Sequence, residues 1–373
     1  ISVLAITGGV KVGHQPDTTK LLPSMASFHP TFLLAVPRVF EKVYNSSEQK
    51  AEAGGKGKIF RKAAHTAVEY SKALDAGHVP LGLRLRFALF DRLVLSKLRA
   101  ALGGRVKYAV SGSAPLGLHL GHFFRAVGVS ILEGYGLTET TAPVSVNVPS
   151  NFKIGKVGPP LPGNEVKLDE DGEILVRGIC VFQEYWKNPE ATAEVFDADG
   201  WFRTGDIGSI DEGGYLAITG GQKEIIVTAG GKNVAPAMLE DPIRSNTIIG
   251  QVIVVGDQRP FISALITLDE EMLPAWLGNN GLDPKMSLEE ARSNRVVLDE
   301  VQRAIDAANE RVSRAESIRK FAILDSELTE ASGHLTPKLS IKRHIIVQDF
   351  ADIIDAMYSS DSTPATEGLS YKG

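Results

Sequence analysis

Segments typical of strands alternate with segments typical of helices over the first 140 residues or so of this 373-residue chain. Residues 31–36 are a continuous apolar run, which indicates a buried strand. A strand, a helix and a further strand are then indicated over residues 105–110, 116–127 and 129–132. Because parallel neighbours need such crossovers, this order predicts an α/β fold whose parallel sheet is covered by helices.

After about residue 150, the pattern of predicted secondary structure changes twice. Residues 151–221 hold short strands separated by Gly, Pro and Asp, which predict an antiparallel meander or small β-barrel after the α/β part of residues 1–150. Residues 222–358 combine strands with two helical segments and predict a smaller α+β domain. Residues 359–373 are rich in Ser, Thr and Gly, and we expect them to be disordered.

Composition excludes several classes of protein. The formal net charge of −5, with both signs interspersed, gives no footprint for nucleic acid. Cys180 is the only cysteine, so no internal disulfide can form, and no Cys/His spacing fits zinc. The single cysteine fits a reducing cytoplasm. No apolar run reaches the roughly 18 residues that span a bilayer, and no signal peptide is visible. Peripheral contact with the inner membrane face stays open. Oligomeric state is left undetermined.

Residues 131–141 combine an apolar strand end with an aromatic ring, two glycines, hydroxyls and a carboxylate. Tyr135 can stack on a base, Thr138 can bond a phosphate oxygen, and Glu139 is a hard oxygen ligand for Mg²⁺. The alternative is a turn that leads into a capped helix. Residues 111–114 and 133–141 both follow strands, and ligands of α/β sheets bind outside those carboxyl ends.

Two later segments also suit a ligand. Residues 201–208 set Asp206 in a tight glycine turn, where an ionised carboxylate can accept hydrogen bonds from both ribose hydroxyls. The alternative is an Asx-turn, in which the side chain of Asp206 bonds its own backbone. For the tripeptide Thr204-Gly205-Asp206 in isolation, this alternative is preferred. Residues 220–236 place a strand between glycine pairs, so that Gly220-Gly221 suits a hinge and Gly230-Gly231 suits passage of a thin ligand. A plain hairpin is the alternative.

Taken together and in this order, these loops resemble those of the adenylate-forming superfamily, which includes acyl-CoA synthetases, peptide-synthetase adenylation domains and firefly luciferase. The strongest resemblance is to bacterial long-chain fatty acyl-CoA synthetases, over residues 36–44, 111–116 and 227–236. It covers nearly the whole chain except the tail. It implies an ATP-dependent long-chain fatty acid–CoA ligase that forms an acyl-adenylate and then a thioester, with ATP and Mg²⁺ as cofactors and CoA as co-substrate.

The resemblance also implies roles for individual residues. Ser113 and Ala114 would line the adenine pocket, Tyr135 would stack on the base, and Asp206 would hold the ribose. Thr138 and Glu139 would act on the α-phosphate and on Mg²⁺. The full set expected to bind the nucleotide and CoA is Gly112, Ser113, Ala114, Glu133, Gly134, Tyr135, Gly136, Thr138, Asp206, Lys223, Gly230 and Gly231.

In the smaller domain, Lys223 matches the family's hinge position and would be the pivot of a rotation that exchanges two active sites. CoA would then enter past Gly230-Gly231, and its thiolate would displace AMP. Division of the chain would follow this hinge: residues 1–221 would be the C-terminal part of the large domain, and residues 222–358 the mobile lid.

The sequence departs from the family pattern in three places. The family's phosphate loop would lie upstream of Ile1, so we expect an N-terminally truncated chain. Gly221 stands where relatives have an arginine, and Ser340 stands at the position of the catalytic lysine. Lys338 and Lys342 share a face with Ser340 if the segment is extended, and either could supply the missing charge. A solvated basic edge is the alternative.

These departures leave two further hypotheses beside the ligase. One is an adenylate-binding protein with impaired ligase activity. The other is a fatty acyl-AMP ligase that passes its product to a carrier protein, against which the Gly230-Gly231 pair argues mildly.

Overall fold

The computed structural model describes residues 7–15, 17, 20–221, 224–336, 341–359 and 369–370. The chain divides into two compact units, which are described separately. The first runs up to Ser111 and includes Leu118–Leu132, and the second contains Gly112–Gly117 and everything from Glu133 onward.

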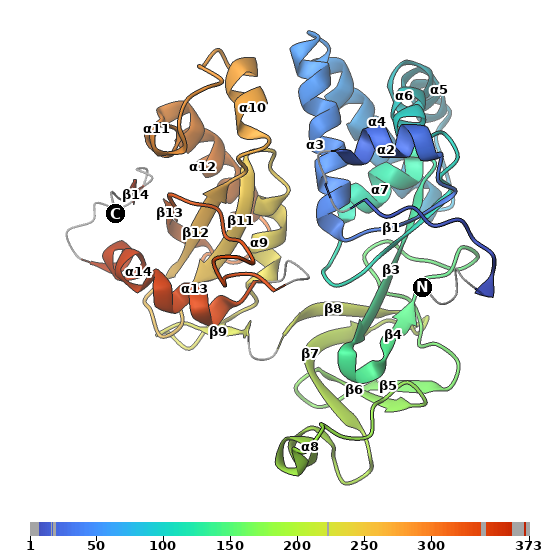
Figure 1. The fold of residues 1–373 in the computed structure, drawn as a ribbon, viewed down its shortest axis with the longest axis vertical. Coiled ribbons are helices and arrows are strands. Elements are labelled where there is room, and N and C mark those ends of the chain that lie inside the picture. The colour runs from blue at the N-terminus through green and yellow to red at the C-terminus, as the bar shows by residue number, and fades with distance from the viewer. Residues whose placement is uncertain are drawn as a thin grey trace. The chain divides into compact units, whose positions relative to one another are not determined.

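The first unit is helical around the start of a parallel sheet (Figure 1). Strands β1 (Phe32–Leu34) and β2 (Tyr108–Ser111) pair in parallel, with Phe32 opposite Tyr108. The helical segments are α2 (Leu21–Phe28), α3 (Pro37–Ala53), α4 (Gly57–Asp75), α5 (Leu81–Phe90), the π-helical η2 (Asp91–Leu95), α6 (Ser96–Ala101) and α7 (Leu118–Val127).

Helix α7 shows how the sequence forms this layer. Its buried side chains Leu120, Phe123, Phe124 and Val127 recur at the spacing that gives a helix one apolar face. Phe123 packs edge-on against Phe124 and against Tyr44 of α3. The helix ends at Val127 and is followed by Gly128, whose φ of +100° favours glycine.

The strand predicted at residues 31–36 exists as β1, but the prediction that it is buried is wrong. Phe32 and Leu34 remain 48% and 52% exposed. The reason is that β1 is the edge strand of a four-stranded sheet with the order β1-β2-β3-β4, and no layer formed by the described residues covers its outer side chains.

Strand β3 (Ser130–Leu137) begins in the first unit and continues into the second, where it pairs antiparallel with β4 (Ala142–Val146) around the 3₁₀ turn η3 (Thr138–Thr140). The prediction of a loop over residues 133–141 is therefore wrong for residues 133–137, which belong to β3. Gly136 permits this pairing, since a Cβ there would lie 2.0 Å from the carbonyl oxygen of Ala142.

The β-rich part of the second unit confirms the predicted antiparallel meander. Its strands are β5 (Asn164–Leu168), β6 (Glu173–Gly178), β7 (Phe202–Ile210) and β8 (Leu216–Gly221), in the order β5-β6-β7-β8. Their inward side chains form a core that includes Ile174, Val176, Phe202 and Leu216. Helix α8 (Pro189–Val195) lies between β6 and β7 in the sequence, and Asn188 caps it through the amide of Ala191.

The C-terminal part is the predicted α+β arrangement. A short hairpin, β9 (Ile226–Val227) and β10 (Asn233–Val234), precedes a four-stranded sheet of β11 (Ile249–Val255), β12 (Ile262–Leu268), β13 (Ile318–Ile323) and β14 (Leu369–Ser370). The helices are α9 (Ala237–Arg244), α10 (Leu273–Asn279), α11 (Leu288–Ser293), α12 (Arg295–Asn309), α13 (Arg343–Asp349) and α14 (Ala351–Tyr358).

Both faces of this sheet are covered (Figure 1). Along β11, Val252 and Val254 pack with the α9 and α12 side, whereas Ile253 and Val255 pack with the α13 and α14 side. Because successive strand side chains alternate between faces, a strand covered on both sides needs a continuous apolar run.

The tail gives a mixed result. Residues 360–368 and 371–373 lie outside the described residues, and Leu369–Ser370 pair in parallel with β13. These two residues depart from the predicted disorder. The predicted domain division at residues 221 and 358 stays a prediction.

Candidate functional site

Two of the predicted site residues meet by a direct hydrogen bond in the second unit. Tyr135 of β3 donates its phenolic hydroxyl to Oδ2 of Asp206 on β7 at 2.7 Å. Burial raises the pKa of Asp206, and the nearby Glu173 carboxylate raises it further, while the hydrogen bond from Tyr135 opposes the shift. The pKa of the Tyr135 hydroxyl is also raised, chiefly by burial and then by the negative charge of Asp206, so Tyr135 remains a donor.

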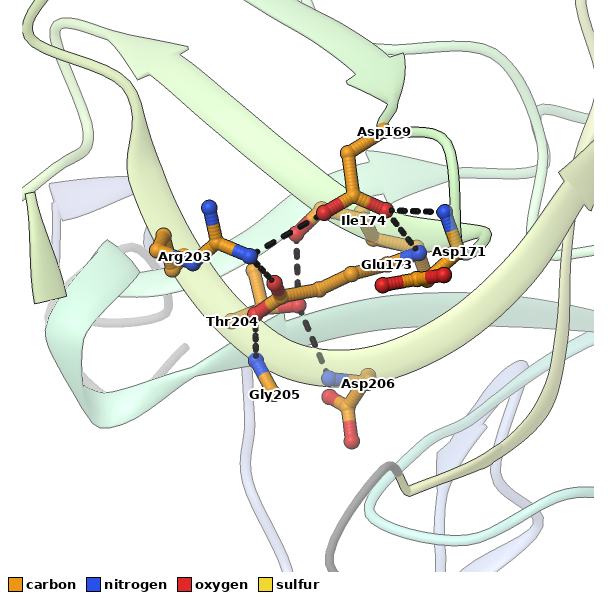
Figure 2. A network of polar contacts seen from close by, with 8 residues as sticks. All are labelled: Asp169, Asp171, Glu173, Ile174, Arg203, Thr204, Gly205 and Asp206. Atoms are coloured by element: carbon orange, nitrogen blue, oxygen red, sulfur yellow. Dashed lines mark hydrogen bonds and ion pairs between the residues drawn. The ribbon is translucent and has the colours of Figure 1, made fainter. Parts of the chain in front are cut away.

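Asp206 lies within strand β7, next to a residue with unusual backbone conformation. The prediction of a tight glycine turn at residues 201–208 is therefore wrong. Gly205 has a φ of +72° within β7, a conformation that costs glycine little. The hydroxyl of Thr204 donates to the carbonyl of Ile174 at 2.7 Å and accepts from the amide of Asp206 at 3.1 Å (Figure 2). The Asx-turn alternative is not what the structure has, because Asp206 uses its carboxylate on Tyr135.

An ion pair between the buried Glu173 and the partly exposed Arg203 supports this bend (Figure 2). Glu173 accepts a hydrogen bond from the amide of Gly205 at 2.9 Å through Oε1, and its Oε2 accepts from the guanidinium of Arg203. Arg203 also donates to Asp169 at 3.0 Å. The side chain of Glu173 is only 3% exposed, so the guanidinium offsets a charge that would be costly alone. Sequence reasoning missed Glu173 and Arg203, because nothing in their spacing marks them.

Glu139 lies in η3 and is held by the loop that follows β6. The hydroxyl of Tyr185 donates to Glu139 Oε1 at 2.9 Å, and the amide of Phe182 donates to the carbonyl of Glu139 at 2.7 Å. Tyr185 was also missed from the sequence, because its partner lies 46 residues earlier in the chain. Only the folded meander brings the two together.

These groups share one cavity of about 510 Å³, a volume in the range of small-molecule sites. Glu139 and Asp206 both line it, and Tyr135 is joined to it through Asp206. Thr138, adjacent to Glu139, is exposed and is not among the lining residues that the structure describes. The polar lining includes Glu139, Glu173, Tyr185, Glu194, Arg203 and Asp206. Carboxylates dominate, so an anionic ligand would need a cation beside it.

The loop of residues 112–117 lies against β3. Ser113 has a φ of +71°, and Ser113 and Ala114 are exposed. Glu133, expected to bind the nucleotide, is instead 7% exposed and accepts a hydrogen bond from the amide of Leu116 at 3.0 Å. Burial raises its pKa to about 7. A Cβ on Gly112 would lie 3.5 Å from the carbonyl oxygen of Gly134, so the loop and strand approach closely there.

The remaining predicted residues belong to the C-terminal part. Gly230 and Gly231 form the turn of the β9–β10 hairpin, where the Gly231 amide donates to Thr228 at 2.8 Å, so the hairpin geometry of the alternative is present. Lys342 precedes α13, and its amide donates to the carbonyl of His334 at 2.9 Å. Lys223, Lys338 and Ser340 lie outside the described residues.

The predicted hinge glycines are part of a strand. Gly220 and Gly221 are the last residues of β8, and Gly221 is paired with Asp206. Gly221 also lines the cavity, at the position where the family pattern has an arginine.

A metal ion would not be held here by protein groups alone. In the parts of the chain that the structure describes, no group of three or more His, Cys, Asp or Glu side chains is arranged to bind a metal. A cation at Glu139 would therefore depend on ligand oxygens and water, as Mg²⁺ often does beside phosphates.

Comparison with protein families decides what kind of chain this is. A model of the AMP-binding enzymes matches residues 3–186, and a model of the C-terminal domain of AMP-binding enzymes matches residues 223–362. The chain belongs to the AMP-binding enzymes. The resemblance to the adenylate-forming superfamily is therefore confirmed.

Curated relatives among the AMP-binding enzymes carry consistent names. A long-chain-fatty-acid–CoA ligase of Mycobacterium bovis is 52% identical over 361 residues, which cover 97% of this chain and 60% of that protein. The peroxisomal long chain acyl-CoA synthetase 7 of Arabidopsis thaliana is 32% identical over 96% of this chain and 53% of its own length. The chain thus spans between half and two thirds of the curated relatives it matches.

Solved structures of AMP-binding enzymes confirm the fold. The didomain of a carboxylic acid reductase from Segniliparus rugosus, in complex with AMP, aligns with a TM-score of 0.65 at 24% identity, over 93% of this chain and 44% of that one. The adenylation domain of a carboxylate reductase from Mycobacterium chelonae gives the same TM-score and identity over 92% of this chain and 49% of that one. At this level of identity, the likeness supports the predicted α/β fold and nothing finer.

Proposed function

We propose that this protein is an ATP-dependent long-chain fatty acid–CoA ligase. The observation that carries the proposal is the shared cavity, which is lined by Glu139 and by Asp206, whose carboxylate accepts a hydrogen bond from Tyr135 at 2.7 Å. The names of the curated relatives supply the substrate class. A fatty acid carboxylate is a poor electrophile until its oxygen becomes part of a good leaving group, and AMP provides that leaving group.

In this proposal Asp206 and the residues of the neighbouring loops and strand bind and orient AMP. Asp206 accepts hydrogen bonds from the ribose hydroxyls, while Tyr135 fixes the carboxylate and presents its ring to the base. Ser113 and Ala114 line the adenine side, and Thr138 donates to the α-phosphate. Of these residues, Asp206 lines the cavity and Tyr135 is hydrogen-bonded to it, whereas Ser113, Ala114 and Thr138 are not among the described residues of the lining.

The same cavity fits a cation that accompanies the nucleotide. Glu139 uses Oε1 on Tyr185, and Oε2 accepts no hydrogen bond from a described residue, so one hard oxygen is available. Mg²⁺, when bound, would offset the negative charge of the phosphates. The described lining contains several carboxylates and one positively charged side chain, Arg203. Because Arg203 is already paired with Glu173 and Asp169, a bound cation would be needed to balance the phosphates.

The second half-reaction is assigned to the C-terminal part. We propose that Lys223 is the pivot and that CoA passes the Gly230-Gly231 turn to attack the acyl-adenylate. In the first half-reaction, which precedes this step, Lys338 or Lys342 supplies charge during adenylation, in place of the lysine replaced by Ser340. Gly221 lines the cavity without the five donors of an arginine, which favours a weak first half-reaction as the second candidate function.

Two assays on the chain separate these candidates. Palmitate, ATP and CoA test the complete reaction, and preformed palmitoyl-adenylate with CoA tests thioester formation alone. Thioester from both assays supports the ligase. Thioester from the adenylate alone, with negligible ATP–pyrophosphate exchange, identifies impaired adenylation. Transfer to a carrier protein but never to CoA would replace the proposal with a fatty acyl-AMP ligase.

We further propose that the protein acts in the cytoplasm, in peripheral contact with an anionic membrane. None of the helices in the described residues is long and apolar enough to cross a membrane. On α5, however, Leu81, Leu85 and Leu89 are 72%, 66% and 57% exposed at a spacing of four residues, which places them on one side. Arg84 and Arg86 are exposed on the same helix. An apolar stripe beside cations suits an interfacial helix.

Replacing one leucine of this stripe tests the contact. Leu85→Ser should weaken co-sedimentation with phosphatidylglycerol-containing vesicles about fivefold, because it removes roughly 1 kcal/mol or more of apolar burial. Binding should also fall as salt rises. Ile179→Ser, at an 85% exposed site in the other unit, is the control and should leave binding unchanged. Equal loss in both variants, or none in Leu85→Ser, would refute a role for α5.

A further inference from the structure

The carboxylate of Glu139 is held by one side chain of the loop that follows β6. Tyr185 Oη donates to Oε1 at 2.9 Å, whereas no described residue donates to Oε2. The phenolic hydroxyl is the donor in this hydrogen bond, and the carboxylate oxygen of Glu139 accepts it.

Further contacts fix the backbone of the same turn. The amide of Phe182 donates to the carbonyl of Glu139 at 2.7 Å, and the hydroxyl of Thr141 donates to the carbonyl of Cys180 at 3.1 Å. Glu139 is thus held through its backbone and its side chain by one loop. A carboxylate tied at both points loses little freedom when it binds a ligand.

Tyr185 is itself built into the fold. Its amide donates to Thr192 Oγ1 at 3.0 Å, and its carbonyl accepts from the amide of Asn188 at 3.1 Å, at the start of α8. Its ring centroid lies 4.7 Å from that of Phe182. The side chain also lines the cavity. The phenol therefore reaches Glu139 from a fixed base and not from a free loop tip.

We propose that Tyr185 is a positioning residue, which orients the carboxylate of Glu139 so that Oε2 faces the divalent cation bound with ATP. The inference rests on the proposed function and deepens it by adding a residue outside the family loops recognised in the sequence. Partners that hydrogen-bond a metal ligand commonly change metal affinity by about 10-fold to 100-fold when removed. A single neutral donor belongs at the lower end of that range.

The test measures the Mg²⁺ requirement of ATP binding. Calorimetric titration of ATP at stepped Mg²⁺ concentrations should give a half-saturating Mg²⁺ concentration about 10-fold higher in Tyr185→Phe than in the unchanged chain. Binding of AMP without metal, and thioester formation from palmitoyl-adenylate and CoA, should each stay within about twofold. A structural role for the hydroxyl would impair all three together: the half-saturating Mg²⁺ concentration would rise, while AMP binding and thioester formation would both fall.

Tyr215→Phe is the matched control, because its hydroxyl bonds Asn151 in the same unit and it is not among the described residues that line the cavity. It should leave the Mg²⁺ requirement unchanged. The inference is overturned if Tyr185→Phe and the unchanged chain need the same Mg²⁺, or if AMP binding falls by the same factor. Continued thioester formation from the adenylate would then show that the proposed function survives. Absence of Mg²⁺ dependence and of thioester in the unchanged chain would overturn both.

Discussion

Asp206→Ala should weaken AMP binding by roughly 100-fold, the largest loss expected from one side chain of the cavity. A hydrogen bond to a charged group is worth about 1.5–3 kcal/mol, and Asp206 is proposed to accept from both ribose hydroxyls. Even the lower figure for each bond gives about 3 kcal/mol, or roughly two orders of magnitude. The variant also leaves the buried Tyr135 hydroxyl without the acceptor that it has at 2.7 Å.

Calorimetric titration with AMP measures this loss, and two further variants locate its cause. Asp206→Asn keeps one acceptor and should fall between the two extremes. Asp211→Ala removes a carboxylate that pairs with Lys153 at 3.0 Å just beyond β7, away from the described lining of the cavity, and should bind AMP normally. Undiminished AMP binding by Asp206→Ala would mean that the ribose lies elsewhere and that the assignment of this cavity is wrong.

The meeting of Tyr135 with Asp206 could be predicted from sequence better than the backbone that carries them. Tyr135, Glu139 and Asp206 are expected to act together, and in the structure Glu139 and Asp206 line one cavity while Tyr135 is hydrogen-bonded to Asp206. Their segments, however, are expected to be loops, whereas Tyr135 and Asp206 lie in strands. Glycine causes this error. It usually marks a turn, but at Gly136 it makes room for a neighbouring strand, and at Gly205 it bends a strand that continues.

Supporting residues escape sequence reasoning for a different reason. Glu173 holds the Gly205 amide from the adjacent strand, and Tyr185 reaches Glu139 from 46 residues away. Neither pair has a fixed spacing, because the register of the meander decides which side chains face each other. The exposure of β1 is equally invisible in its apolar sequence, since it depends on the strand's place at the sheet edge.

The second large effect is a pH dependence of stability that Glu133→Gln should remove. Burial raises the pKa of Glu133 from 4.5 to about 7, while hydrogen bonds from the amides of Leu116 and Gly155 oppose the shift. Between these two values the folded chain binds more protons than the unfolded chain, so stability falls as pH rises. The contribution is fully present below about pH 4.5 and is lost above about pH 7.

This pKa shift of Glu133 corresponds to a loss of about 3 kcal/mol in the free energy of unfolding as the pH rises from about 4.5 to about 7. Glutamine resembles the protonated acid and can still accept from the amide of Leu116 through its carbonyl oxygen, so Glu133→Gln should raise the urea midpoint at pH 8 and change it little at pH 4.5. Glu310→Gln, at an exposed position after α12, controls for loss of a negative charge and should shift neither midpoint. If Glu133→Gln destabilises the chain at pH 8, the ionised carboxylate stabilises the loop of residues 112–117. In that case Glu133 would belong among the charged groups of the site, as the family resemblance suggests, and not among the buried acids that hold its backbone.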